Sequence, residues 1–247
     1  MIPIFNKVTG FSFKRVSKGV WLILLPLLLL LFWYFPIVNV PVRIATLVTA
    51  ALVVGESIFL AWRFRLFRWL LVVCYILFAA FILLPSRPIQ NRPDLRAAYC
   101  NELESYLGSP YFWGGEGRFG IDCSGLVRRG MEDALVSSGF HCLDSSLLRQ
   151  GILLWWQDTN AKGIGEGYSG KTHLITTCRS LNELDYSLLL PGDLAVTASD
   201  THVMAYLGKK TWIAADPSEM RVTKFSIPEK NLYFNSPARI VRWSMLE

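Results

Sequence analysis

Three long apolar runs occupy the first third of the chain. Gly19–Val42 holds 24 residues without a charge, Ile44–Trp62 holds 19 residues with Glu56 as the one charge, and Trp69–Ser86 holds 18 uncharged residues. A helix that crosses a lipid bilayer needs roughly 20 apolar residues. The pattern therefore predicts a membrane anchor over residues 1–85, with transmembrane helices at about 20–40, 44–62 and 69–85.

A signal peptide or a buried helical hairpin would fit these runs less well. A cleavable signal peptide has a shorter apolar core that ends at a small-residue cleavage site, and the first run has neither feature. The length and composition of the second and third runs disfavour a helical hairpin buried in a soluble protein. Glu56 lies six residues from the end of its run, which favours snorkelling or an interhelical hydrogen bond over a functional role.

Basic residues predict the orientation of the anchor. Four precede the first run, one lies between the first and second runs, and three lie between the second and third. Positively charged residues favour the cytoplasmic side of a membrane. The N-terminus is therefore expected inside the cell and, after three spans, everything beyond Ser86 outside the cell membrane.

The rest of the chain has a balanced charge. The net charge is +6, but residues 69–247 hold 17 basic and 18 acidic residues. A globular nucleic-acid binder would carry its positive charge on the folded domain, so no nucleic-acid partner is expected.

The five cysteines have no CxxC pair, and His141 and His173 lack metal-ligand spacing, so we expect no metal and no cofactor. Outside the cytoplasm, Cys142 and Cys178 could form a disulfide, with Cys100 as a competing partner.

After a proline-rich linker at 86–93, the sequence pattern predicts one α+β domain over residues 94–247. One helix is expected from Asp94, as its N-cap, to about Leu107, with Gly108 as its stop. A second helix is expected from Cys123 to about Ser138, ending at Gly139.

Alternating strand-like runs follow these helices, and helices followed by antiparallel strands are typical of α+β domains. Residues 140–190 show no clear pattern except a glycine-rich loop at 163–170. The predicted strands are 193–198, 202–207, 211–215 and 238–243, with turns at 199–200 and 208–210.

Cys123 and His202 are the predicted reactive pair. Cys123 is expected at a helix N-terminus, where unpaired backbone N–H groups and the helix dipole stabilise a thiolate and lower the pKa of the thiol. His202, on a strand, could take the thiol proton. By residue type alone, a buried structural cysteine and an ordinary surface histidine would be the commoner outcome.

Four sequence blocks around this pair point to a family. They are PYFWGG at 110–115, GIDCSGLV at 120–127, LPGDL at 190–194 and HVMAYLG at 202–208. In this order they resemble the NlpC-type family of bacterial cell-wall cysteine peptidases over residues 94–245, and the resemblance implies a papain-like fold. It also implies that Cys123 is the nucleophile and His202 the general base.

The same resemblance implies roles for three further residues. Tyr111 would line the site and help to bind the oxyanion, and Asp122 and Ser124 would help to recognise the free amine of a stem peptide. Simpler roles stay open: Tyr111 in the core, Asp122 as a helix cap, and Ser124 as a partner of a backbone N–H.

The sequence departs from the family pattern in two places. The third polar residue, usually twelve positions after the base, is replaced by Ala214. Asp216 lies on the same strand face, where it could orient His202 or begin a turn. Segment 140–190 is longer than usual, and its Trp155 and Trp156 could wall the cleft or cover a small satellite core.

The resemblance implies a cysteine hydrolase that cleaves an amide bond in peptidoglycan stem peptides, and the apolar runs predict that it is anchored in a membrane. The expected partners are the stem peptide and the lipid bilayer. The family precedent is the bond from D-Glu to the diamino acid. One alternative is a thiol amidase or acyltransferase on a lipid-linked substrate, against which the Cys-before-His order argues. Another is a catalytically degenerate domain that binds wall peptides or a partner, which Ala214 favours.

The topology predicts the activity of reporter fusions. An enzymatic reporter fused after Glu247 is expected to be active only outside the cytoplasm, and one fused after Arg65 only inside it, because of the distribution of basic residues. A cytoplasmic signal from the C-terminal fusion would contradict the three-span topology.

Overall fold

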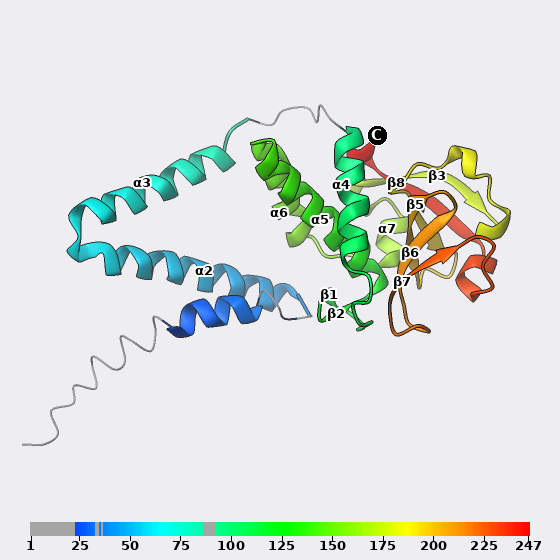
Figure 1. Cartoon of the computed structure of the whole chain (residues 1–247), viewed down its shortest axis with the longest axis horizontal. Coiled ribbons are helices and arrows are strands. Elements are labelled where there is room, and N and C mark those ends of the chain that lie inside the picture. The colour runs from blue at the N-terminus through cyan, green and yellow to red at the C-terminus, as the bar shows by residue number, and fades with distance from the viewer. Residues whose placement is uncertain (1–22, 33–34, 36, 86–91) are drawn as a thin grey trace, which may run out of the picture. The chain divides into compact units, whose positions relative to one another are not determined.

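The computed structural model describes residues 23–32, 35, 37–85 and 92–247. The chain divides into two compact units, one of Met1–Trp33 with Pro41–Val73 and the other of Tyr34–Val40 with Cys74–Glu247 (Figure 1). The predicted basic tail, residues 20–22, 33–34 and 36 of the predicted first span, and most of the predicted linker at 86–93 lie outside the described residues.

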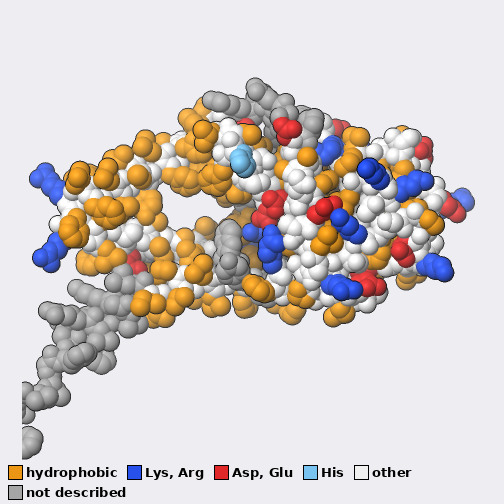
Figure 2. Space-filling model, viewed as in Figure 1, with side chains coloured by type: hydrophobic (Ala, Val, Ile, Leu, Met, Phe, Trp, Pro, Cys, Tyr) orange, Lys and Arg blue, Asp and Glu red, His pale blue; other side chains and the backbone are white. Residues whose placement is uncertain are grey.

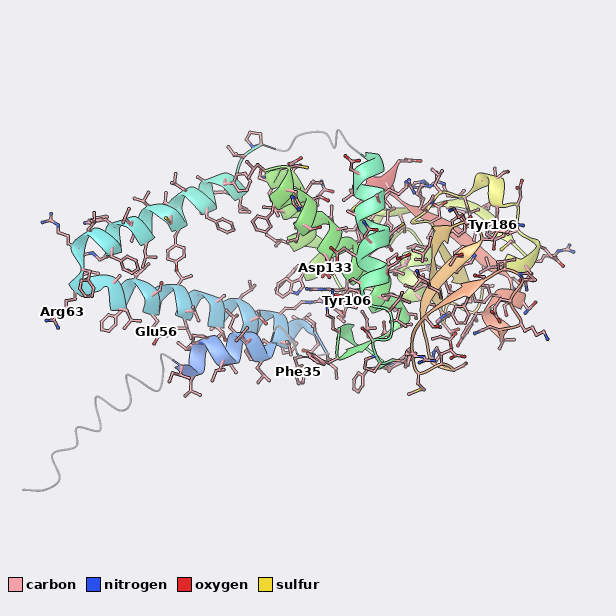
Figure 3. All side chains as sticks on the ribbon, viewed as in Figure 1. Phe35, Glu56, Arg63, Tyr106, Asp133 and Tyr186 are labelled. Atoms are coloured by element: carbon pink, nitrogen blue, oxygen red, sulfur yellow. The ribbon has the colours of Figure 1, made fainter. Side chains whose placement is uncertain are left out.

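The second and third apolar runs form long helices. Helix α2 (Val40–Leu60) continues into the 3₁₀ turn η1 (Ala61–Arg63), and helix α3 (Arg65–Ile82) follows after a single residue. Figure 2 shows hydrophobic side chains along both helices and basic ones at the turn between them, where Figure 3 labels Arg63. By length and composition, two helices of the described chain qualify as candidate membrane spans.

Of the described part of the first run, Ile23–Phe32 forms a shorter apolar helix, Ile37–Asn39 are not helical, and the residues from Val40 begin α2. The prediction of one helix over 20–40 is therefore wrong at Ile37–Asn39, where Ile37 pairs with the backbone of Gly115. Three transmembrane spans and their orientation therefore stay a prediction. The two long helices also begin about four residues earlier than the sequence pattern predicts.

The C-terminal strands form one six-stranded antiparallel sheet in the order β3-β8-β4-β5-β6-β7. Four strands lie within two residues of the predicted runs. The edge strands β3 and β7 were not predicted, because half-exposed edge strands carry many polar residues and weaken the alternation. The strands are β3 (Thr172–Cys178), β4 (Leu194–Thr197), β5 (Val203–Gly208), β6 (Thr211–Asp216), β7 (Arg221–Ser226) and β8 (Ala238–Trp243).

Four helices precede or interrupt the strands: α4 (Arg92–Ser105), α5 (Cys123–His141), α6 (Ser145–Trp156) and α7 (Ala161–Gly165). Tyr106, just after α4, donates a hydrogen bond to Asp133 on α5 at 2.7 Å, and Figure 3 shows the two side chains together. Helices with an antiparallel sheet confirm the predicted α+β fold.

Two helix ends differ from the prediction. Helix α4 begins before Asp94, which therefore lies in its first turn, near the positive end of the helix dipole, and is not the N-cap. Helix α5 continues through Gly139, where a Cβ atom would lie 2.7 Å from the Leu148 side chain. Gly139 thus lets α6 approach α5. Gly108 follows the end of α4 with a φ of +80°, as a helix stop should.

Segment 140–190 is more ordered than its sequence pattern indicates. Besides α6 and β3, it holds α7 and the 3₁₀ turn η2 (Tyr168–Gly170) within the run predicted as a loop, and further on η3 (Leu181–Glu183) and η4 (Tyr186–Leu188). Tyr168 is buried in the main core cluster, so the glycine-rich run is packed against the domain and does not form a free loop.

The sheet separates two hydrophobic clusters. Alternate residues of β5, Val203 and Ala205, pack with the helices, whereas Met204 and Tyr206 pack on the opposite face with Ala214. This period-two alternation carries His202, just before β5, and Asp216, the last residue of β6, toward the face opposite the helices.

All five cysteines lie in the described part of the chain and are free, so the disulfide suggested for Cys142 with Cys178 or Cys100 is not formed. Within the same residues, no group of three or more His, Cys, Asp or Glu side chains could hold a metal ion.

Candidate active site

Asp122 fixes the start of α5. Its Oδ1 accepts hydrogen bonds from the backbone N–H of Gly125 at 2.6 Å and from Ser124 Oγ at 2.9 Å, and its Oδ2 accepts from the N–H of Gly114 at 2.8 Å. Asp122 is therefore the N-cap of the helix. The cap makes Cys123 the first residue of α5.

Two glycines allow the preceding loop to lie against this helix start. Asp122 N–H donates to Gly115 O at 3.0 Å, and a Cβ atom on Gly125 would lie 2.2 Å from that same oxygen. A Cβ atom on Gly115 would lie 2.4 Å from Gly120 O. Because backbone atoms are the obstacles, glycine is required at both positions.

Cys123 is buried, with 8% of its surface exposed, and its Sγ lies 4.0 Å from the backbone oxygen of Thr201. Burial raises the pKa of the Cys123 thiol to about 12, and the charge of Asp122 adds to the shift, while the backbone N–H groups of Val203 and Ser124 oppose it. The prediction of a lowered pKa is wrong, because the loss of solvation outweighs the helix N-terminus.

His202 directly precedes β5 and is fixed there by backbone hydrogen bonds. Its backbone N–H donates to Thr197 Oγ1 at 3.2 Å, and its backbone oxygen accepts from Thr197 N–H at 3.0 Å. Burial lowers the pKa of the imidazole to about 4, against an opposing effect of Asp216. The ring is therefore neutral at pH 7. Its Nε2 is buried and has no hydrogen-bond partner among the described residues.

Asp216 is fully buried and ends β6. Its Oδ1 accepts from the N–H groups of Ser218 at 2.7 Å and Glu219 at 3.2 Å, as expected of a turn residue. Its Oδ2 accepts from Asn231 Nδ2 at 2.9 Å. The β5–β6 register, continued past Ala205–Ile213, sets Asp216 opposite His202, whose pKa its charge raises. Ala214 lies in the hydrophobic cluster.

Two tyrosines complete the surroundings of the pair. Burial raises the pKa of Tyr111 to about 12, and the nearby Cys123 adds to the shift, so the phenol stays protonated at neutral pH. Tyr233, on the 3₁₀ turn η5 (Leu232–Asn235), stacks on His202 with ring centroids 4.0 Å apart. Sequence reasoning missed Tyr233, because no motif surrounds it and only the tertiary contact reveals it.

Asp122 and Ser124 also line a cavity of about 560 Å³. On its wall, the buried guanidinium of Arg128 forms ion pairs with Glu116 and, at 3.0 Å, with Asp158. Ser124 Oγ donates to Asp122 and does not serve a backbone N–H, the simpler role considered for it. The structure thus brings Cys123 close to the backbone beside His202 and places the two predicted amine-binding residues in an adjoining cavity.

Segment 140–190 reaches this cavity through Asp158, Thr159 and Asn160. Trp155 and Trp156 are not among its lining residues; their rings lie 6.3 Å apart near the end of α6.

Comparisons with known proteins agree with the motifs. The NlpC/P60 family model matches residues 108–235, whereas comparison with curated proteins gives no match. NlpC1 from Trichomonas vaginalis is 21% identical with a TM-score of 0.40, over 59% of this chain and 42% of that chain. An NlpC/P60 family protein from Bacillus cereus is 20% identical with a TM-score of 0.41, over 60% and 40% of the two chains.

The peptidoglycan hydrolase RipB from Mycobacterium tuberculosis is 19% identical with a TM-score of 0.41, over 63% of this chain and 68% of that chain. This chain spans less than half the length of the first two structures. The family match covers more than half of this chain and includes Tyr111, Cys123, His202 and Asp216. Members of this family are cysteine peptidases and amidases, and the chain belongs to the NlpC/P60 family.

Proposed function

We propose that this protein is a membrane-anchored cysteine hydrolase that cleaves an amide bond in peptidoglycan stem peptides outside the cell membrane. Residues 1–85 would be the anchor and residues 94–247 the catalytic domain. One observation carries the proposal: Cys123, first in α5, lies against the backbone beside His202, whose neutral Nε2 has no partner among the described residues. General-base activation requires a neutral imidazole within reach of the thiol, which this position of the two residues supports.

The reaction follows from these groups. His202 takes the thiol proton of Cys123 as the sulfur attacks the carbonyl carbon of the scissile amide. The oxyanion is stabilised by backbone N–H groups at the start of α5 and by the protonated phenol of Tyr111. The imidazolium then gives its proton to the leaving amine, which leaves a thioester. Water, activated by His202, hydrolyses the thioester and restores the thiol.

The acid–base state of the resting pair shapes the first step. Because burial raises the pKa of the thiol and lowers the pKa of the imidazole, both groups start neutral in the proposed mechanism and proton transfer accompanies the attack. Asp216 favours the imidazolium by its charge, and Tyr233 holds the ring plane by stacking. Both are positioning residues, since each acts through His202.

Peptide digestion tests the proposed function. The full chain in detergent should cleave the peptide L-Ala-γ-D-Glu-L-Lys at the γ-glutamyl bond, with products identified by mass spectrometry. Cys123→Ala should lower turnover by about 10⁴ or more, because it removes the nucleophile but little volume. Cys142→Ala, at an exposed cysteine, should keep the parent rate. Equal turnover by Cys123→Ala would refute the mechanism, and peptide binding without cleavage by the parent chain would assign a binding role.

The substitution Asp216→Asn tests whether the negative charge of Asp216 acts on His202 or whether Asp216 only forms the turn after β6. Loss of the carboxylate should lower kcat about ten-fold and move the acid limb of the pH–rate profile to lower pH, because the charge that raises the pKa of His202 is gone. Asn231→Ala leaves the charge of Asp216 but removes a hydrogen bond to it and the side-chain cap on Tyr233 N–H, so it should cost about 1–2 kcal/mol of stability and lower kcat without moving the acid limb. If Asp216→Asn melts earlier but turns over at the parent rate, Asp216 is only a turn residue.

The pH dependence of alkylation tests the neutral pair. Modification of Cys123 by iodoacetamide, followed by peptide mass spectrometry on the full chain, should accelerate about ten-fold per pH unit from pH 6 to 9. The reason is that the thiolate fraction grows throughout this range when the pKa is about 12. The exposed Cys142, measured in the same digests, controls for the reagent. A rate independent of pH over this range would indicate a preformed thiolate.

A further inference from the structure

The cavity beside Asp122 and Ser124 has a wall from a distant part of the sequence. Ile37, Val38 and Asn39 line it together with those two residues. They precede α2, more than eighty positions before Asp122, yet belong to the same compact unit as the rest of the site. The C-terminal part of the first apolar run, just before α2, therefore contributes to the substrate region of the catalytic domain.

Backbone pairing fixes this segment to the site. Ile37 forms an isolated antiparallel bridge with Gly115. The backbone oxygen of Gly115 also accepts a hydrogen bond from the N–H of Asp122 and lies against Gly125 at the start of α5. One loop thus holds both the N-cap of the catalytic helix and the wall formed by Ile37–Asn39, so the wall has a defined place relative to Asp122.

The charges in the cavity indicate what it accepts. The lining holds three carboxylates, of Glu116, Asp122 and Asp158, and one guanidinium, that of Arg128. Arg128 is 2% exposed, is held by ion pairs to Glu116 and Asp158, and its Nε has no hydrogen-bond partner among the described residues. The excess negative charge suits a peptide end that carries an ammonium group.

We propose that Ile37–Asn39 determines specificity by closing the cavity, so that a substrate peptide must end there at its free amine. A residue added beyond that amine would meet Val38 and Asn39. The inference rests on the proposed function, because it takes the stem peptide as the ligand. Ile37–Asn39, just before α2, then have two roles, as a connection to the anchor and as a wall of the site.

Two peptides test the wall: L-Ala-γ-D-Glu-L-Lys and the same peptide extended by one Gly at its N-terminus. Dissociation constants are measured by calorimetry on the full chain carrying Cys123→Ala, in detergent, so that neither peptide is consumed. The shorter peptide should bind at least about thirty-fold more tightly, because the extended one collides with the wall.

Val38→Ala with Asn39→Ala should reduce this preference about ten-fold by enlarging the cavity. The matched control is Val40→Ala, at the neighbouring exposed residue that does not line the cavity, and it should leave the ratio within about two-fold. A ratio of dissociation constants does not depend on the fraction of folded protein.

The outcomes separate this inference from the proposed function. Three results would contradict the proposed role of Ile37–Asn39. They are an unchanged ratio of dissociation constants in the double variant, equal binding of both peptides by the parent, and no binding of either peptide. If the peptides bind with the expected ratio but the chain that retains Cys123 does not cleave them, the proposed hydrolase function is contradicted. The proposed role of Ile37–Asn39 in specificity is then still supported.

Discussion

The site depends on one close contact, between the loop before α5 and the first turn of that helix. Asp122 accepts three hydrogen bonds there, and Gly115 and Gly125 approach so closely that a side chain on either would meet backbone atoms. The contact orients the N-terminus of α5 and makes Cys123 its first residue. It also sets the edge on which Ile37 pairs, so nucleophile and cavity share one support.

Burial determines the chemistry of this arrangement. A helix N-terminus favours a thiolate, but Cys123 is too little solvated for that effect to prevail, and the negative charge of Asp122 works against it. The same desolvation keeps His202 neutral. The residue that caps the helix therefore also opposes early ionisation of the nucleophile. The charge of Asp216, opposite His202 in the strand register, acts in the other direction and favours the imidazolium.

The antiparallel sheet brings the base to the nucleophile. Val203 and Ala205 pack under the helices, and Met204 and Tyr206 pack on the opposite face, which fixes the register of β5 and the place of the residue before it. On that opposite face, Tyr233 stacks on the imidazole and Asn231 binds Asp216. The short turn η5 and the residue before it therefore hold both the ring of His202 and the carboxylate behind it.

The sequence by itself determined the local features of this protein. Periodicity indicated the strands β4, β5, β6 and β8 and the start of α5, and local motifs identified Cys123, His202 and the family. These features are local, because alternation, helix caps and glycine-requiring turns are written within a few neighbouring residues.

Only the tertiary structure decided how Tyr233 meets His202, how Ile37–Asn39 joins the cavity, and which direction the pKa of Cys123 takes. The edge strands β3 and β7 were also missed, since their half-exposed residues carry a weak pattern. Each of these features depends on burial and on contacts between residues far apart in the chain. Neither burial nor such contacts can be read from a residue's neighbours in the sequence.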